Sequence, residues 1–237
     1  MGSRFHPGAR SMSTSDMPTQ EQLVLWGPAA AAFLLVAIGV LWRLSRNVVT
    51  IAHEGGHALV AVLTGRRLSG IKLHSDTSGL TVSRGRPTGP GMVFTAMAGY
   101  VAPSLLGLGF ALLVVGDQVR LMLWLSIALL AAVLVMTRNV FGVISVIATG
   151  AILVWVSFYA SDPVRDACAF GFCWFLLFGG VRPVWELQVK RWRRQARGSD
   201  ADILARLTPV PALAWVLLFL VVSVGSLVLG GGLLLGR

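Results

Sequence analysis

The hydrophobic residues of this chain gather into long runs that short polar segments separate. Most runs are near 20 residues long, about the length that an α-helix needs to cross a bilayer. Six of them are interpreted as membrane-spanning helices: residues 23–42, 92–115, 121–136, 140–160, 167–181 and 209–235. The polar residues 1–22 show no such pattern and are expected to form a flexible tail. Residues 23–237 are expected to form one integral-membrane domain.

Two segments depart from this pattern. The apolar run at residues 47–65 contains a polar cluster in its middle and is expected to enter the membrane only part-way. Residues 69–83 alternate between apolar and polar positions around a turn at 76–79, which is typical of a β-hairpin. In this hairpin the apolar residues of the two strands are expected to face each other, Ile71 and Leu73 opposite Leu80 and Val82.

The composition agrees with a membrane protein. Of the 237 residues 55% are hydrophobic and only 13% are charged, whereas soluble domains carry about 25% charged residues. A disordered chain is excluded because disorder requires low hydrophobicity. The two cysteines, Cys168 and Cys173, lie in an apolar run without the spacing of a disulfide or zinc framework. We therefore predict an all-α polytopic membrane protein with about six spans, a partly inserted helix and a short hairpin.

The basic residues indicate the orientation in the membrane. The chain has a net charge of +10, and basic residues concentrate in cytoplasmic loops. Residues 190–197 contain five basic residues and no acidic one, so we expect them to lie in the cytoplasm and to contact anionic lipid head groups rather than nucleic acid. If the 47–65 helix does not cross fully, every basic loop lies on the cytoplasmic side.

The polar cluster inside the 47–65 helix is His53-Glu54-Gly55-Gly56-His57. Ionisable groups at membrane depth are costly, which makes them candidates for function. On a helix, positions i and i+4 share one face, so both imidazoles can bind a single Zn²⁺. Glu54 beside them can act as the general base of a metalloprotease. The alternative is a pair of structural histidines with Glu54 as their partner.

These residues and several that follow resemble the site-2 protease family of intramembrane zinc metallopeptidases, in particular its bacterial B-like branch. The likeness covers about residues 45–220. It is carried by the segments His53-Glu54-x-x-His57-Ala58-Leu59, Leu73-His74-x-Asp76, Gly79-Leu80-Thr81, Gly99-Tyr100 and Ser199-Asp200-Ala201. The resemblance implies a polytopic protein of the cell membrane that cuts transmembrane substrates near the cytoplasmic face. It also implies a zinc ion held by two histidines and one aspartate.

The third zinc ligand has several candidates. A catalytic zinc takes three protein ligands and a water, and the larger family supplies its aspartate from a Leu-Asp-Gly motif that this chain lacks. Asp200 and Asp202, at the start of the last helical stretch, are the main candidates, and Glu186 is a further one. The resemblance points to Asp200. Alternatively, Ser199, Asp200 or Asp202 caps the N-terminus of a helix.

Three other polar residues have two interpretations each. His74 and Asp76, on the hairpin, either contact the substrate or belong to an exposed turn in which Asp76 caps the backbone. Asn139 either donates a hydrogen bond to an oxyanion or belongs to a turn at the membrane interface.

The sequence thus favours a zinc-dependent endopeptidase that cuts membrane-embedded protein substrates, as in regulated intramembrane proteolysis. A substrate helix must unwind locally before its amides can react, and an edge of the hairpin could then bind the extended strand. Two alternatives remain: a catalytically inactive scaffold or regulator of the same fold, and an ion or proton transporter that uses the polar cluster as a relay.

Overall fold

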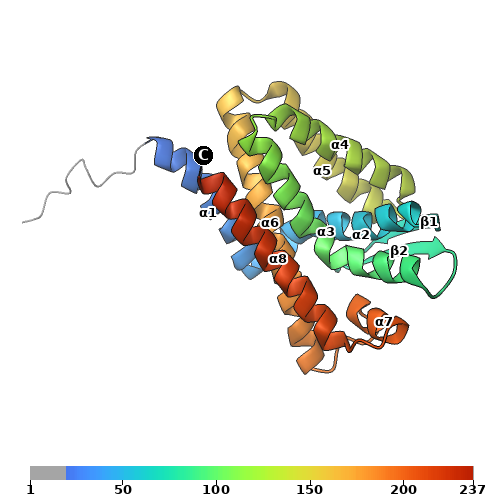
Figure 1. Cartoon of the computed structure of the whole chain (residues 1–237). Helices are drawn as coiled ribbons and strands as arrows, with labels where there is room; N and C mark the ends of the chain where they lie inside the picture. Colours follow the sequence, from blue (N-terminus) through green and yellow to red (C-terminus); the bar gives the residue numbers. More distant parts are fainter. Residues whose placement is uncertain (1–19, 237) are drawn as a thin grey trace, which may run out of the picture.

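The computed structural model describes residues 20–236, which form a bundle of helices with one small sheet at its side (Figure 1). The predicted tail, residues 1–22, lies outside the described part except for its end, which begins the first helix. The elements in chain order are α1 (Gln20–Ala37), α2 (Gly39–Leu63), β1 (Arg67–Leu73), β2 (Gly79–Arg84), α3 (Pro90–Val115), α4 (Val119–Met136), α5 (Val140–Tyr159), α6 (Asp162–Trp192), α7 (Asp200–Leu207) and α8 (Ala212–Leu235).

The first apolar run does not form the straight span that its length predicts. Helix α1 ends at Ala37, and α2 begins at Gly39 after a bend of 100°. The residue between them, Ile38, has an extended backbone (φ −79°, ψ 119°), and the glycine after it is a weak helix former. Trp42, predicted to end the first span, therefore lies in α2, which also contains the whole polar cluster.

The number of spans agrees with the prediction of about six. Within residues 20–236, five helices are long and apolar enough to cross a membrane, and α1 with α2 makes a sixth if the bent pair counts as one span. Helix α6 is longer than the predicted run 167–181 at both ends, because it begins at Asp162 and continues through Pro183 to Trp192.

The core of the bundle lies where α3 packs against α2, α6 and α8. Small residues let the α3 and α6 backbones approach closely: Gly180 lies against Ser104, and Gly107 against Leu176 and Leu177. Close packing of small residues is the usual way in which helices associate in lipid. It makes α3 a firm support for the elements on either side of it.

The hairpin is present, but the predicted facing of its apolar residues is wrong. The antiparallel register places Ile71 opposite Thr81 and Leu73 opposite Gly79. Ile71 and Leu73 are buried, whereas Leu80 and Val82 are exposed on the other face. The turn extends from His74 to Ser78. It is closed by the backbone N–H of His74, which donates to the carbonyl of Ser78 at 2.8 Å. A register different by one residue reverses the face of every side chain.

The connection between α4 and α5 covers the outer edge of β1. The Arg138 N–H donates to the Ile71 carbonyl at 2.8 Å. The Asn139 side chain bonds the Leu73 backbone twice: its Oδ1 accepts from the N–H at 3.1 Å, and its Nδ2 donates to the carbonyl at 2.6 Å. Asn139 is thus bound to the hairpin. Within the described residues, β1 is the only strand beside β2.

Candidate metal centre

Two histidines of α2 form one side of a cluster of possible metal ligands. Because His53 and His57 are one helical turn apart, their rings lie on the same face. Their Nε2 atoms are 3.1 Å apart, and the ring centroids are 4.7 Å apart in an edge-to-face arrangement. His57 is buried and His53 is partly exposed.

Asp200 completes this cluster from a distant part of the sequence. It is the first residue of α7, and its Oδ2 lies 3.3 Å from the Nε2 of each histidine. The three ligand atoms lie within 4.8 Å of one another, the only such group of three or more in the described part of the chain. Burial alone would raise the pKa of Asp200, but the charge and hydrogen bonds of His57 and His53 outweigh it and hold this pKa well below its ordinary value.

The other candidates for a third ligand have different partners. Asp202 accepts a hydrogen bond of 2.5 Å from the Arg191 guanidinium. Glu186 accepts hydrogen bonds from the Trp42 indole at 2.9 Å and from Arg182 Nε at 3.1 Å. Neither carboxylate belongs to the cluster. Of the three residues predicted as possible helix caps, Ser199 has this role, since its hydroxyl accepts the N–H of Asp202.

Helix α3 forms the wall behind the two imidazoles. His57 Nδ1 lies 2.7 Å from the carbonyl oxygen of Thr95; when Nδ1 donates its proton there, Nε2 is left as a free ligand atom, the usual arrangement of a metal-binding histidine. The missing side chain of Gly99 makes room for both rings, because a Cβ there would lie 2.6 Å from His53 Nε2. Tyr100 packs edge-to-face on His53 with ring centroids 4.8 Å apart.

The Thr95 contact could not be predicted from the sequence. The Thr95 carbonyl is a backbone group that any residue would carry, so no residue type indicates it. Gly99 and Tyr100, by contrast, were indicated by the resemblance.

The hairpin covers the remaining group of the site, the carboxylate of Glu54. Glu54 is 4% exposed, and its Oε2 accepts a hydrogen bond of 2.6 Å from the Thr81 hydroxyl of β2. The absence of a side chain at Gly79 makes this approach possible, since a Cβ there would lie 2.5 Å from Glu54 Oε1. A further bond of 3.0 Å joins the Thr50 hydroxyl of α2 to the Thr77 carbonyl.

His74 and Asp76 do not join the site, so the interpretation as an exposed turn is correct. Asp76 Oδ1 accepts hydrogen bonds from Ser78, from its N–H at 2.9 Å and from its hydroxyl at 2.6 Å. These bonds hold the pKa of the exposed Asp76 carboxyl below its ordinary value. The His74 ring also lies against the Ser78 hydroxyl, at 3.3 Å.

The donor atoms of the cluster fit a zinc ion. Two imidazole nitrogens and one carboxylate oxygen converge from α2 and α7, and three protein ligands of this kind are typical of a catalytic zinc site. The space at Gly99 and the orientation of His57 keep both Nε2 atoms directed at the same point.

A comparison with protein families agrees with this arrangement. The model of the family described as peptidase M50B-like matches residues 26–230. The chain belongs to this family. The match confirms the resemblance to the site-2 proteases, which are metallopeptidases, and together with the apolar helices it identifies a multi-pass membrane protein. No curated protein and no solved structure matches this M50B-like chain.

Proposed function

We propose that this M50B-like protein is a zinc-dependent endopeptidase that hydrolyses peptide bonds of transmembrane or membrane-anchored proteins. One observation carries the proposal: His53 and His57 of α2 and Asp200 of α7 present three ligand atoms within 4.8 Å of one another. Glu54 lies on α2 beside the two histidines. A zinc ion held by these three residues would supply Lewis acidity to the reaction.

The buried carboxylate of Glu54 is proposed as the general base. It takes a proton from the attacking water and later delivers it to the nitrogen of the leaving amine. The Thr81 hydroxyl supports this role, because its bond to Oε2 restricts the orientation of the carboxylate. Two positions on β2, Gly79 and Thr81, thus lie directly against the proposed base.

The free edge of β2 is the proposed docking site for the substrate. The other edge of the hairpin is occupied by residues 137–139. A substrate segment that has unwound from its helix can form backbone hydrogen bonds with β2. A strand added at this edge would run next to Glu54, since Thr81 contacts that carboxylate. Helix-breaking residues in the substrate are therefore expected to favour cleavage.

The proposed location of the site is the cytoplasmic side of the cell membrane. The basic segment 190–197 adjoins α7 through the bond between Arg191 and Asp202, so Asp200 and this segment lie at the same end of the molecule. Basic residues of this kind are typical of cytoplasmic loops and bind anionic lipid head groups. Trp192 of this segment packs on Trp185; both are exposed, as is usual for aromatic residues at a membrane interface.

The proposal is tested with Glu54→Gln beside the wild type, using a membrane-anchored reporter and a measurement of bound zinc. We expect the variant to keep its zinc and to lose processing. Equal processing by the two proteins would reject the proposed role of Glu54. Zinc-loaded wild type that cleaves no reporter would instead favour the scaffold, and ion transport that survives chelation would favour the transporter.

A further inference from the structure

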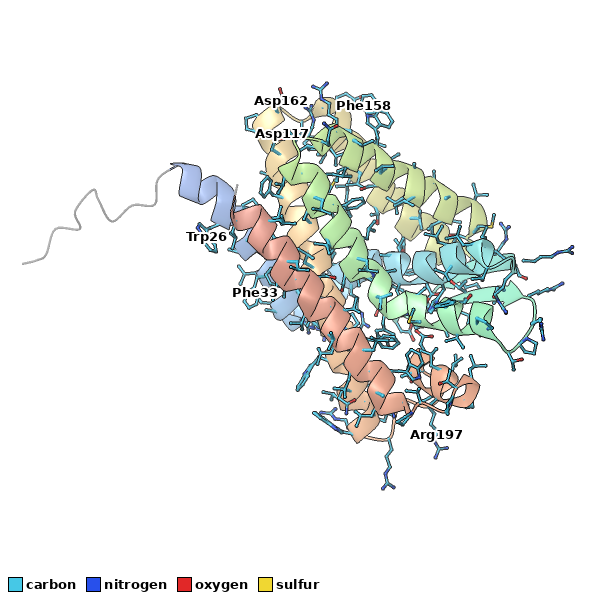
Figure 2. The ribbon with its side chains drawn as sticks, in the orientation of Figure 1. Trp26, Phe33, Asp117, Phe158, Asp162 and Arg197 are labelled. Carbon is cyan, nitrogen blue, oxygen red and sulfur yellow. The ribbon has the colours of Figure 1, made fainter. Side chains whose placement is uncertain are left out.

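A second site candidate lies at the end of the bundle opposite α7. There the start of α4, the end of α5 and the start of α6 surround a partly open cavity of about 340 Å³. Figure 2 shows Phe158 and Asp162 at this end and Arg197 at the other. The cavity is lined by Arg120, Leu123, Trp124, Ser157, Phe158 and Arg165. We propose that it binds a phosphate group, carried by an anionic phospholipid or free in solution.

Two buried donors on residues that line the cavity have no acceptor among the described residues. Arg165 is largely buried; its Nη2 donates to the Ala160 carbonyl at 2.9 Å, and its Nη1 pairs with Asp162. Its Nε and the Ser157 hydroxyl are also buried, yet neither has a hydrogen-bond partner among the described residues. Since buried polar groups are nearly always bonded, these two donors indicate a ligand with acceptor oxygens.

The charge of the cavity favours an anion. Its lining contains two guanidinium groups and no carboxylate. Asp162, beside the cavity, pairs with Arg165 and lies 3.9 Å from Arg120, so the two arginines share this carboxylate. The other acidic residues at this end, Asp117 and Asp166, do not line the cavity. Arginine presents a planar set of donors that can bind two phosphate oxygens at once. Lysine presents only a compact point charge, so arginine matches the shape of a phosphate better.

The aromatic residues favour a lipid as the carrier of the phosphate. The rings of Trp124 and Phe158 are 5.4 Å apart, edge to face, and both side chains are exposed. Such residues gather where lipid head groups meet the hydrocarbon layer. The volume is at the lower end of that of ligand pockets, which suits a head group with its acyl chains lying outside.

The test measures retained lipid on the full-length protein. Native mass spectrometry counts bound phosphatidylglycerol and, in a parallel sample, phosphatidylcholine; a third sample receives inorganic phosphate alone. The cavity variants are Ser157→Ala, which removes one unpaired donor, and Arg120→Gln at the exposed rim. The matched control is Arg43→Gln, which removes an equal charge at an exposed position of α2 away from this cavity.

We expect phosphatidylglycerol to be retained by the wild type and by the control. Each cavity variant should retain about tenfold less, the effect of losing one charge-assisted hydrogen bond. Binding of inorganic phosphate that the cavity variants also weaken would support the same phosphate site with a soluble ligand. Equal retention by all four proteins, or equal retention of phosphatidylcholine and phosphatidylglycerol, would overturn the proposal.

Discussion

The hydrogen bond between Thr81 and Glu54 offers a sensitive test of how the hairpin serves the proposed reaction. The Thr81 hydroxyl has one proton and lies 2.6 Å from Glu54 Oε2 and 3.1 Å from the Glu54 backbone carbonyl. The shorter distance and the negative charge favour the carboxylate as acceptor. Thr81→Val keeps the shape of the side chain and removes this bond.

The expected loss follows from the strength of such a bond. A hydrogen bond to a charged group contributes about 1.5–3 kcal/mol, which corresponds to about a 10- to 150-fold decrease in rate if the bond acts in the transition state. Thr81 lies beside the proposed base and does not contact the three proposed ligands. We therefore expect a lower kcat with little change in KM and with the zinc content of the wild type.

The assay compares initial rates of reporter cleavage in nanodiscs at several substrate concentrations, together with bound zinc. Thr81→Ser keeps the hydroxyl and should retain most of the activity. Thr64→Val is the matched control, because the exposed Thr64 hydroxyl bonds only carbonyls of its own helix, those of Val60 and Ala61. If Thr81→Val cleaves at the rate of the wild type, the proposed orienting role of this bond is wrong. A variant that instead loses its zinc would show that Thr81 supports the fold of the centre.

Three further predictions concern the metal centre and the hairpin. Asp200→Ala should lose bound zinc, because it removes one of the three proposed ligands, while Asp202→Ala should keep it. Metal analysis of both purified variants decides this, and equal zinc contents would exclude Asp200 as a ligand. Gly99→Ala should decrease zinc affinity by about tenfold or more, since the methyl group of the new alanine would overlap the imidazoles. A zinc titration that shows unchanged affinity would contradict this geometry. Asn139→Ala removes both side-chain bonds to the Leu73 backbone, so the amide of Leu73 should exchange its hydrogen faster; unchanged exchange would show that these bonds do not hold β1 in place.

Local features were predictable because short stretches of sequence determine them. The apolar runs are long enough to identify the spans, and the spacing of His53 and His57 places both rings on one face of any helix. The hairpin was also indicated by its alternation, and its bounds of 67–84 are close to the predicted 69–83. The facing of its strands was not predictable, because the turn and the packing of Ile71 and Leu73 against the bundle select the register.

Other features depended on segments that are far apart along the chain. The bend at Ile38 joins the first apolar run to the helix of the polar cluster, although nothing in the hydrophobicity of residues 23–42 interrupts that run. Asn139 bonds the Leu73 backbone, and a backbone group carries no sequence signal. Only the fold shows that this asparagine anchors the hairpin.

The sequence by itself determined that this is a membrane protein of helices and that one helix carries two imidazoles on one face beside a carboxylate. Only the tertiary structure decided which acidic residue lies beside the two imidazoles. Asp200 and Asp202 have the same chemistry and lie on the same turn of α7, but that turn directs Asp200 to the imidazoles and Asp202 to Arg191. Which carboxylate joins the two imidazoles depends on where its side chain points in space, and this direction is set by the packing of α7 against α3 and α8.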